Sequence, residues 1–241
     1  MLRVVRPAVT LPVPDMRLHD GPPPFSAHLK LHGVTMPSER YANLGGDARA
    51  RLAEDLGRFL AEMHAIDRDA IRAAGAVEVE FWRTDEAALS FAWQQLPAVI
   101  APSIRAALDD YRRLPPDPLG EVYGFFDAHG WNMAYDAVGD RLAGLFDFAD
   151  SGFGSPHRDF VQPSLISADL TLAAMETYQR LSGRAIDRRR VFLLTATQRL
   201  SEFAGMVETG GDVDAWRGAV VRWMAEAERF GWSASDLSGR R

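Results

Sequence analysis

The segment NMAYDAVGDRLAGLFD, which begins at Asn132 and ends at Asp147, carries the pattern of a β-hairpin. Its Gly-Asp dipeptide at 139–140 favours a tight two-residue turn, and the mixed apolar and polar residues on both sides favour paired strands. If Val138 pairs with Arg141, each outward step brings another pair into register, and Asn132 meets Asp147 at the open end. The sequence therefore predicts that these two oxygen-bearing side chains face one point.

Asp127 lies in the loop just before this hairpin. Carboxylate and amide oxygens suit Mg²⁺, which accepts few protein ligands and takes the rest from water and phosphate. An Asp at this place can orient or deprotonate an attacking hydroxyl, and the order Asp, Asn, Asp is the one that a kinase-type phosphotransfer site requires. The alternative is structural, because Asp and Asn are common turn residues and an Asp-x4-Asn spacing arises by chance in loops. The hairpin and the second Asp favour a site.

Two runs in this region, FDAHGWNMAYD and LAGLFDFADSGFGSPHRDF, resemble a known enzyme family. They are similar to the catalytic and metal-binding region of the aminoglycoside phosphotransferase and choline kinase-like family, whose usual pattern is HGDxHxxN followed by IDFGDAGxGDPxxDL. The match is strong over residues 120–160 and looser elsewhere. The resemblance implies an α+β, mostly helical fold, with a protein kinase-like C-terminal lobe, a catalytic β-hairpin and a truncated N-terminal lobe.

The resemblance also implies a role for each matching residue. Asp127 falls on the family's catalytic Asp, and Asn132 and Asp147 fall on its metal-binding pair. His129 falls on the His of the catalytic loop, and Asp159 falls on a later Asp that orders this loop. The implied cofactors are Mg and a phosphate donor, ATP or GTP. The implied acceptor is a hydroxyl of a small molecule such as an aminoglycoside, choline or another amino alcohol.

Three positions depart from the family pattern. Phe125-Phe126 replaces His-Gly before the catalytic Asp, Ala149 replaces the Gly of Asp-Phe-Gly, and Ser155 replaces the Asp of Gly-Asp-Pro. None of these changes removes a group that must touch metal or phosphate. An Ala in place of Gly is costly only where the backbone needs a positive φ.

The N-terminal segment resembles only the end of the family's small lobe. Residues 1–35 are expected to form this remnant and the hinge, in which backbone groups of Leu29, Lys30 and Leu31 meet the adenine, and residues 36–241 the helical large lobe. Lys30 is the only lysine of the chain, and neither a Gly-rich loop nor a lysine-bearing strand precedes it. Because these groups position the nucleotide phosphates in kinases, we expect weak nucleotide binding or another way of holding the phosphates.

Composition narrows the class of protein. With 241 residues and 47% hydrophobic content, the chain can bury a sizeable core as one domain or one domain with a small appendage. A net charge of −6 argues against nucleic acid binding and is compatible with a cationic substrate. The absence of Cys excludes disulfides, thiolate catalysis and Cys-zinc sites, and it fits a cytoplasmic protein. The start MLRVVRPAV has no long apolar core, so neither a signal peptide nor a membrane span is expected.

Outside the hairpin the chain has mostly helical periodicity. Helices are predicted around the hydrophobic stretches 47–64, 82–97, 187–203 and 212–230. Three features receive structural interpretations: His64 as a satisfied core or capping group, Trp82, Phe91 and Trp93 as core residues, and the run Arg188–Arg190 as a solvated surface.

Other interpretations stay open. Without the lysine-bearing strand and the Gly-rich loop, the chain also fits a binding module that holds a small molecule or a protein without transferring phosphate. An exposed sheet edge left by missing strands would favour a homodimer or a partner that completes the small lobe. Trp131 either shapes the acceptor pocket or packs against its own loop. Acidic residues of the later helices either attract an amine-bearing acceptor or are simply solvated: Asp169, Glu176, Glu202 and Glu208.

Overall fold

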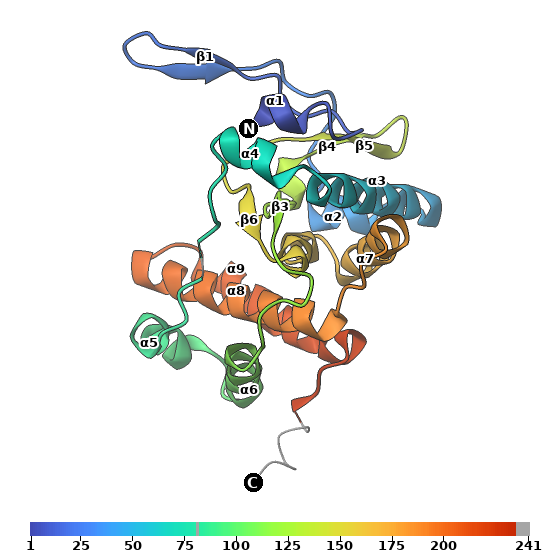
Figure 1. The fold of residues 1–241 in the computed structure, drawn as a ribbon. Helices are drawn as coiled ribbons and strands as arrows, with labels where there is room; N and C mark the ends of the chain where they lie inside the picture. Colours follow the sequence, from blue (N-terminus) through green and yellow to red (C-terminus); the bar gives the residue numbers. More distant parts are fainter. Residues whose placement is uncertain (81, 235–241) are drawn as a thin grey trace. The chain divides into compact units, whose positions relative to one another are not determined.

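The computed structural model of the protein describes residues 1–80 and 82–234 (Figure 1). Helices predominate in this part of the chain, and its strands pair in three small two-stranded sheets. The predicted α+β, mostly helical class is therefore confirmed. The chain forms two compact units, one of residues 1–79 and 119–185 and one of the described part of 80–118 and 186–241. The expected boundary between lobes at residue 35 came from the family resemblance and not from compactness, and it stays a prediction.

The first unit contains the hairpin and the segments around it. Its elements, in chain order, are α1 (Leu2–Val5), β1 (Arg17–His19), β2 (Phe25–Ala27), α2 (Ser38–Ala42), α3 (Gly46–His64), α4 (Arg68–Ala73), β3 (Val122–Gly124), η1 (Gly130–Asn132), β4 (Met133–Asp136), β5 (Arg141–Leu145), β6 (Gly152–Gly154), η2 (Pro156–Phe160), η3 (Gln162–Leu165) and α7 (Ala168–Ser182).

Helix α3 is the scaffold of this unit. Its apolar stripe is fully buried, with Leu52, Leu56, Phe59, Leu60 and Met63 at 3- and 4-residue spacing. The helix lies against α7 (Figure 1). The two backbones approach closely at Gly57, where a Cβ atom would lie 2.6 Å from the carbonyl oxygen of Ala174. A larger residue at position 57 would push the two helices apart.

The β4–β5 hairpin forms, but its register differs from the predicted one. Asp136 pairs with Arg141, so the turn has four residues rather than two, and Val138 lies in the turn. A bulge between Ala134 and Tyr135 shifts the register again towards the open end. There the N–H of Phe146 donates to the carbonyl of Asn132 over 3.0 Å. Asn132 thus pairs with the residue before Asp147, and the predicted Asn132–Asp147 pairing is wrong by one residue.

The second unit is a helical bundle. It contains α5 (Glu86–Gln95), α6 (Ala101–Arg112), α8 (Arg188–Thr209), α9 (Val213–Ala225) and η4 (Ala227–Phe230). Helix α8 packs against α5, α6 and α9. The side chains of Asp85, Asp187 and Asp212 accept backbone N–H groups at the starts of α5, α8 and α9. These caps satisfy donors that the first helical turn leaves without a partner.

Two structural interpretations need correction in this unit. Phe91 is 62% exposed, whereas Trp93 of the same helix packs against the core. Trp82 precedes α5 instead of lying on it. Arg190 is buried, and its guanidinium donates to the carbonyl of Pro115 over 2.9 Å. The arginine run at the start of α8 is therefore not wholly solvated, because the helix turns one of its members towards the bundle.

Candidate active site

Asp127 is held from three sides in the loop between β3 and η1. The side-chain amide of Asn132 donates to its Oδ2 over 2.5 Å and to its backbone carbonyl over 3.1 Å. Its other carboxylate oxygen, Oδ1, lies 3.4 Å from Nε2 of His129 and accepts from the amide of Gln162 over 3.4 Å. The carboxylate is 14% exposed, so one edge remains open. Three of the predicted site residues, Asp127, His129 and Asn132, are thus brought together, and Gln162 is an addition.

Burial is the main cause of a raised pKa for Asp127, which lies at about 7. The negative charge of Asp150 is the second cause, and Asp147 and Asp159 add to it, whereas the hydrogen bond from Asn132 lowers the pKa. A carboxylate with this pKa is suited to accept a proton near neutral pH. The sequence did not single out Asp150, although it lies only three residues after Asp147, and its charge acts on Asp127.

Asp147 follows the hairpin in a left-handed backbone conformation, with φ of 64°. A non-glycine residue in this conformation costs on the order of 1–3 kcal/mol and is found often at functional sites. The N–H of Ala149 donates to Oδ1 of Asp147 over 3.4 Å. Ala149 itself is not among the residues with positive φ, so the Ala at the family's Gly position carries no such strain.

The donor set at the open end of the hairpin fits magnesium. Asn132 and Asp147 offer an amide oxygen and a carboxylate, and the backbone of Asn132 pairs with Phe146, the residue just before Asp147. Within residues 1–80 and 82–234, no cluster of three or more His, Asp or Glu side chains is arranged to hold a metal. A metal here would need further oxygens from water or phosphate. Mg²⁺ binds in this way, with one or two protein ligands.

Asp159 lies beside the segment that leads from β3 to Asp127 and is fully buried. Its two oxygens accept the backbone N–H groups of Phe125, over 3.0 Å, and Phe126, over 2.5 Å. Nε2 of His64 lies 2.8 Å from Oδ2 of Asp159, and Nδ1 of His64 lies 2.9 Å from the hydroxyl of Tyr178. His64 is therefore a satisfied core group, as predicted, and it also connects α3 to the residue that holds the loop.

Phe126 explains why the loop needs this support. It stands where the family has Gly, and its φ is 59°. An L-residue with a large side chain pays a steric cost in this conformation that Gly does not pay. The hydrogen bond from the Phe126 N–H to Asp159 offsets part of that cost and fixes the backbone one residue before Asp127.

Two neighbouring cavities lie beside the hairpin in the first unit. One, of about 550 Å³, includes Lys30 and Leu31 together with Met133 and Phe146 in its lining. The other, of about 840 Å³, is lined by Asp147 among others and shares His28 and Phe146 with the first. Leu29 is 89% exposed and lines neither cavity. Two of the three residues expected at the adenine therefore face a cavity.

Trp131 is 60% exposed, although it lies in η1 between Asp127 and Asn132. Its backbone N–H donates to Nδ1 of His129 over 3.2 Å, and the two rings meet edge to face at 5.8 Å. The same His129 ring approaches the carboxylate of Asp127. Only one side of Trp131 packs against the loop, and the remainder of its ring is accessible.

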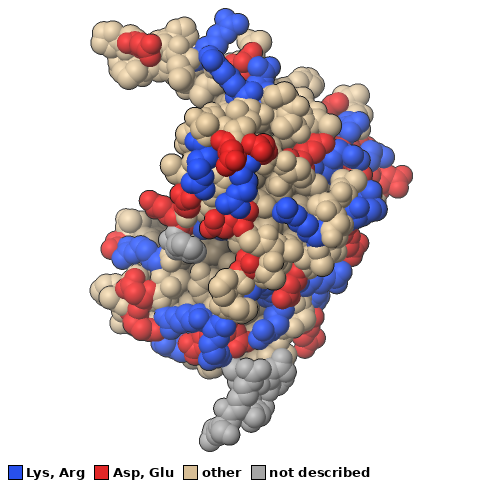
Figure 2. All heavy atoms as spheres, viewed as in Figure 1, with Lys and Arg blue, Asp and Glu red and all other residues tan. Residues whose placement is uncertain are grey.

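The four acidic residues of the later helices belong to different units. Asp169 and Glu176 lie on α7 of the first unit, and Glu202 and Glu208 lie on α8 of the second. Glu208 forms an exposed ion pair of 3.0 Å with Arg83. On the face shown in Figure 2, acidic and basic side chains are interspersed. A role for these residues in acceptor binding stays a prediction.

A family model described as the phosphotransferase enzyme family matches residues 1–194 of this chain. The chain belongs to this family. The match covers the catalytic loop, the hairpin and α7, so the resemblance found in residues 120–160 is confirmed. No curated protein matches the chain significantly.

Solved structures confirm the kinase-like fold of this phosphotransferase family member. The GDP complex of aminoglycoside 2′-phosphotransferase-IIIa is 17% identical, with a TM-score of 0.74, and covers 93% of this chain and 79% of that chain. Macrolide 2′-phosphotransferase MphH from Brachybacterium faecium is 20% identical, with a TM-score of 0.63 and coverage of 91% and 77%. A putative aminoglycoside phosphotransferase from Ralstonia eutropha is 15% identical, with a TM-score of 0.65 and coverage of 98% and 82%.

No helix in the described ranges, residues 1–80 and 82–234, combines the length and the apolar character that a membrane crossing requires.

Proposed function

We propose that this protein transfers the γ-phosphate of ATP or GTP to a hydroxyl group of a small molecule, with Mg²⁺ as cofactor. One observation carries the proposal. The carboxylate of Asp127 is fixed by Asn132 and His129, has a pKa of about 7, and experiences the charge of Asp147 across the site. A proton acceptor beside a pair of Mg²⁺-type oxygen ligands is the arrangement that phosphoryl transfer to an alcohol needs.

Asp127 is proposed to hold the acceptor hydroxyl and to take its proton. The hydroxyl oxygen forms a bond to the γ-phosphorus while the bond from that phosphorus to the bridging β–γ oxygen breaks, and the nucleoside diphosphate leaves. Asn132 keeps the carboxylate in place through its amide N–H, and its amide oxygen, with Asp147, would hold the metal. Bound Mg²⁺ would neutralise charge on the phosphates and would also lower the pKa of Asp127.

The nucleotide base is proposed to enter the cavity of about 550 Å³ beside Lys30 and Leu31. Met133 and Phe146 supply an apolar floor there. The adjoining cavity then receives the phosphates, because Asp147 lies in its wall. This orientation brings the γ-phosphate to the open end of the hairpin, where the metal ligands lie.

The acceptor is proposed to be an alcohol that carries an amine. Three negative charges surround Asp127, from Asp147, Asp150 and Asp159, and the chain has a net charge of −6. Such a field favours cationic substrates. The exposed ring of Trp131 adds an aromatic face for a sugar or a cation. Among the similar structures are a GDP and kanamycin complex and a streptomycin–ATP complex of aminoglycoside phosphotransferases.

The proposal is tested with γ-labelled ATP and GTP, Mg²⁺ and a panel of acceptors that contains kanamycin, streptomycin, a macrolide and choline. We expect label to appear in at least one acceptor, with release of an equal amount of nucleoside diphosphate. A parallel thermal-unfolding titration with nucleotide and Mg²⁺ should raise the unfolding temperature, since a ligand that binds only the folded state stabilises it. No shift at millimolar nucleotide would contradict the proposal and favour a binding module for another ligand.

A further inference from the structure

The cavity of about 840 Å³ contains one arginine, and its position deepens the proposed function. The cavity is bounded by α1, by β1 with the residues just before it, and by the segment that follows β5. Arg3 of α1 is the sole Arg or Lys among the described residues that line it, and Asp147 is the sole Asp or Glu. Arg3 and the predicted metal ligand Asp147 therefore line the same cavity.

The guanidinium of Arg3 has no partner among the described residues. The side chain is exposed, and within residues 1–80 and 82–234 it forms no ion pair or hydrogen bond. Arg6, one helical turn further on, is different because its guanidinium binds Asp15 over 2.7 Å. An arginine without a carboxylate partner is available to an anionic ligand, and its guanidinium matches the oxygens of a phosphate.

A nucleotide placed for phosphoryl transfer would bring its phosphates to this cavity. Asp147 lines only this one of the two cavities, so a metal held by Asp147 draws the phosphates here. The phosphate chain of ATP or GTP carries several negative charges, and the carboxylate of Asp147 in the cavity wall adds another. Phosphoryl-transfer sites therefore place a cationic side chain on the phosphates.

The other candidate cations are less well placed. Lys30 and Arg40 line the smaller cavity, on the side proposed for the base. The guanidinium of Arg40 already donates to the carbonyl of Thr35. Arg158 lies over the ring of Phe126, at 5.8 Å from its centre, and lines neither cavity.

We propose that Arg3 binds the phosphates of the nucleotide and supplies positive charge in the cavity that Asp147 lines. This inference rests on the proposed function, since it assumes a nucleotide whose phosphates meet Asp147. It assigns to the short helix α1 a role in ligand binding. The sequence led us to expect that the phosphates are held by a residue other than Lys30, which lies in the hinge segment. Arg3 is proposed to be that residue.

The test compares Arg3→Gln and Arg3→Lys with the native protein by calorimetric titration of the Mg²⁺ complexes of the tri-, di- and monophosphate of one nucleoside. Arg17→Gln is the matched control, because Arg17 is exposed on β1 and lines neither cavity. We expect Arg3→Gln to weaken triphosphate binding about tenfold or more, the monophosphate hardly at all, and Arg3→Lys to retain part of the affinity.

Two results would overturn the inference while leaving the proposed function intact. The first is equal triphosphate affinity in Arg3→Gln and the native protein. The second is an equal loss for all three nucleotides, which would indicate a structural effect and should appear as a lower unfolding temperature. If the native protein binds none of the three, the proposed function fails and the inference fails with it.

Discussion

At the scale of single residues, the site depends on carboxylates whose surroundings differ sharply. Asp127 is partly buried among other acids, so its pKa rises to about 7. Asp159 is fully buried but accepts two backbone N–H groups and contacts His64. The first arrangement creates a proton acceptor, whereas the second creates a rigid support. The sequence distinguished these roles only through the family resemblance, because burial and hydrogen bonding decide them.

Replacement of the proposed base is predicted to separate activity from stability. Asp127→Asn should reduce phosphate transfer at least about 100-fold, since a positioned acid–base group contributes that much or more. A raised folded-state pKa means that the native protein loses stability as pH rises from about 4 to about 7. The metal-free variant should therefore be more stable than the native protein at pH 8. Transfer assays and urea unfolding check both effects.

Asp20→Asn serves as the control, since Asp20 is exposed and lies between β1 and β2, outside both cavities. It should leave activity and stability as they are. An Asp127→Asn variant that retains more than a tenth of the native rate would rule out Asp127 as the base.

The His64–Asp159 pair is predicted to support both folding and the loop. His64→Ala leaves a buried carboxylate without its partner, which typically costs about 3–5 kcal/mol of unfolding free energy. Tyr178→Phe removes only a hydroxyl from the other side of His64 and should cost about 1 kcal/mol. Urea unfolding measures both, and hydrogen exchange of the Phe125 and Phe126 amides should rise in His64→Ala alone. Equal unfolding free energies for His64→Ala and the native protein would contradict this assignment.

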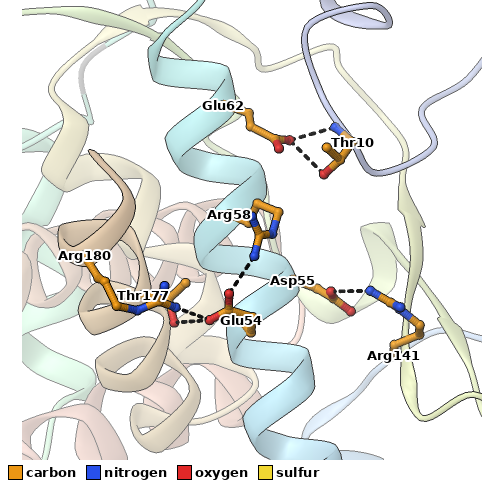
Figure 3. A network of polar contacts seen from close by, with 8 residues as sticks. All are labelled: Thr10, Glu54, Asp55, Arg58, Glu62, Arg141, Thr177 and Arg180. Atoms are coloured by element: carbon orange, nitrogen blue, oxygen red, sulfur yellow. Dashed lines mark hydrogen bonds and ion pairs between the residues drawn. The ribbon is translucent and has the colours of Figure 1, made fainter. Parts of the chain in front are cut away.

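At the scale of elements, α3 is the helix to which the other parts of the first unit are attached (Figure 3). Glu62 accepts from the N–H of Thr10 over 2.7 Å, and Glu54 accepts from Thr177 of α7 over 3.2 Å. The buried carboxylate of Asp55 binds the guanidinium of Arg141 over 2.9 Å. Three acidic side chains of one helix thereby hold the N-terminal segment, α7 and the hairpin.

Hairpin geometry shows where local sequence information ends. The existence of both strands was predictable from their residues, as were α3 and the Asp caps of the second unit. The register of the hairpin was not predictable, because Tyr135 at the bulge also pairs with a residue far away in the sequence, Val34. The backbone N–H and carbonyl of Tyr135 pair with Val34 over 2.8 and 3.0 Å. A contact between residues a hundred positions apart leaves no local signal.

Asp55 is predicted to hold the hairpin in position for the metal ligands. Its Oδ2 accepts the N–H of Leu142 over 3.0 Å, at the strand residue that faces Tyr135 beside the bulge. Asp55→Ala leaves this amide without its acceptor and should cost about 1–3 kcal/mol of unfolding free energy. Amide hydrogen exchange across β4 and β5 should accelerate in this variant, and transfer activity should fall with it.

Arg58→Ala is the matched control on the same helix. Arg58 binds Glu54 in an exposed pair four residues apart, which contributes about 0.3–0.5 kcal/mol. It should change neither hairpin exchange nor activity. Unaltered exchange in Asp55→Ala would show that the hairpin is held by other contacts.

At the scale of the whole molecule, membership of the phosphotransferase family and the kinase-like fold are established, but neither specifies the acceptor. The structural relatives include enzymes for aminoglycosides and for macrolides. Near the candidate site this chain has the exposed Trp131, the acidic surroundings of Asp127, and Arg3 in the cavity of about 840 Å³. Specificity has to be sought in such residues and not in the fold.

Acid stability of the protein is predicted to depend on Asp110 in the second unit. Burial raises the pKa of Asp110, but hydrogen bonds from Arg113 and Trp232 and the charge of Arg189 lower it more. A folded-state pKa below the unfolded value stabilises the protein above about pH 4, and this contribution is lost as pH falls through the folded-state pKa. Urea unfolding between pH 7 and pH 2.5 should show this loss in the native protein.

Asp110→Asn should be less stable at pH 7 and should lose less stability on acidification. Its control is Asp214→Asn, because the carboxylate of Asp214 is exposed and pairs with Arg217 within α9. A native-like dependence on pH in Asp110→Asn would contradict the assignment.

The central claim is that Asn132 and Asp147 form a Mg²⁺-dependent nucleotide site, and it is tested most directly by titrating ATP and GTP into Asp147→Ala with and without Mg²⁺. In the native protein, Mg²⁺ should strengthen the binding of at least one nucleotide. In Asp147→Ala this Mg²⁺ dependence should disappear, while the fold, monitored by thermal unfolding, remains intact. Nucleotide binding that responds to Mg²⁺ equally in both proteins would contradict the account.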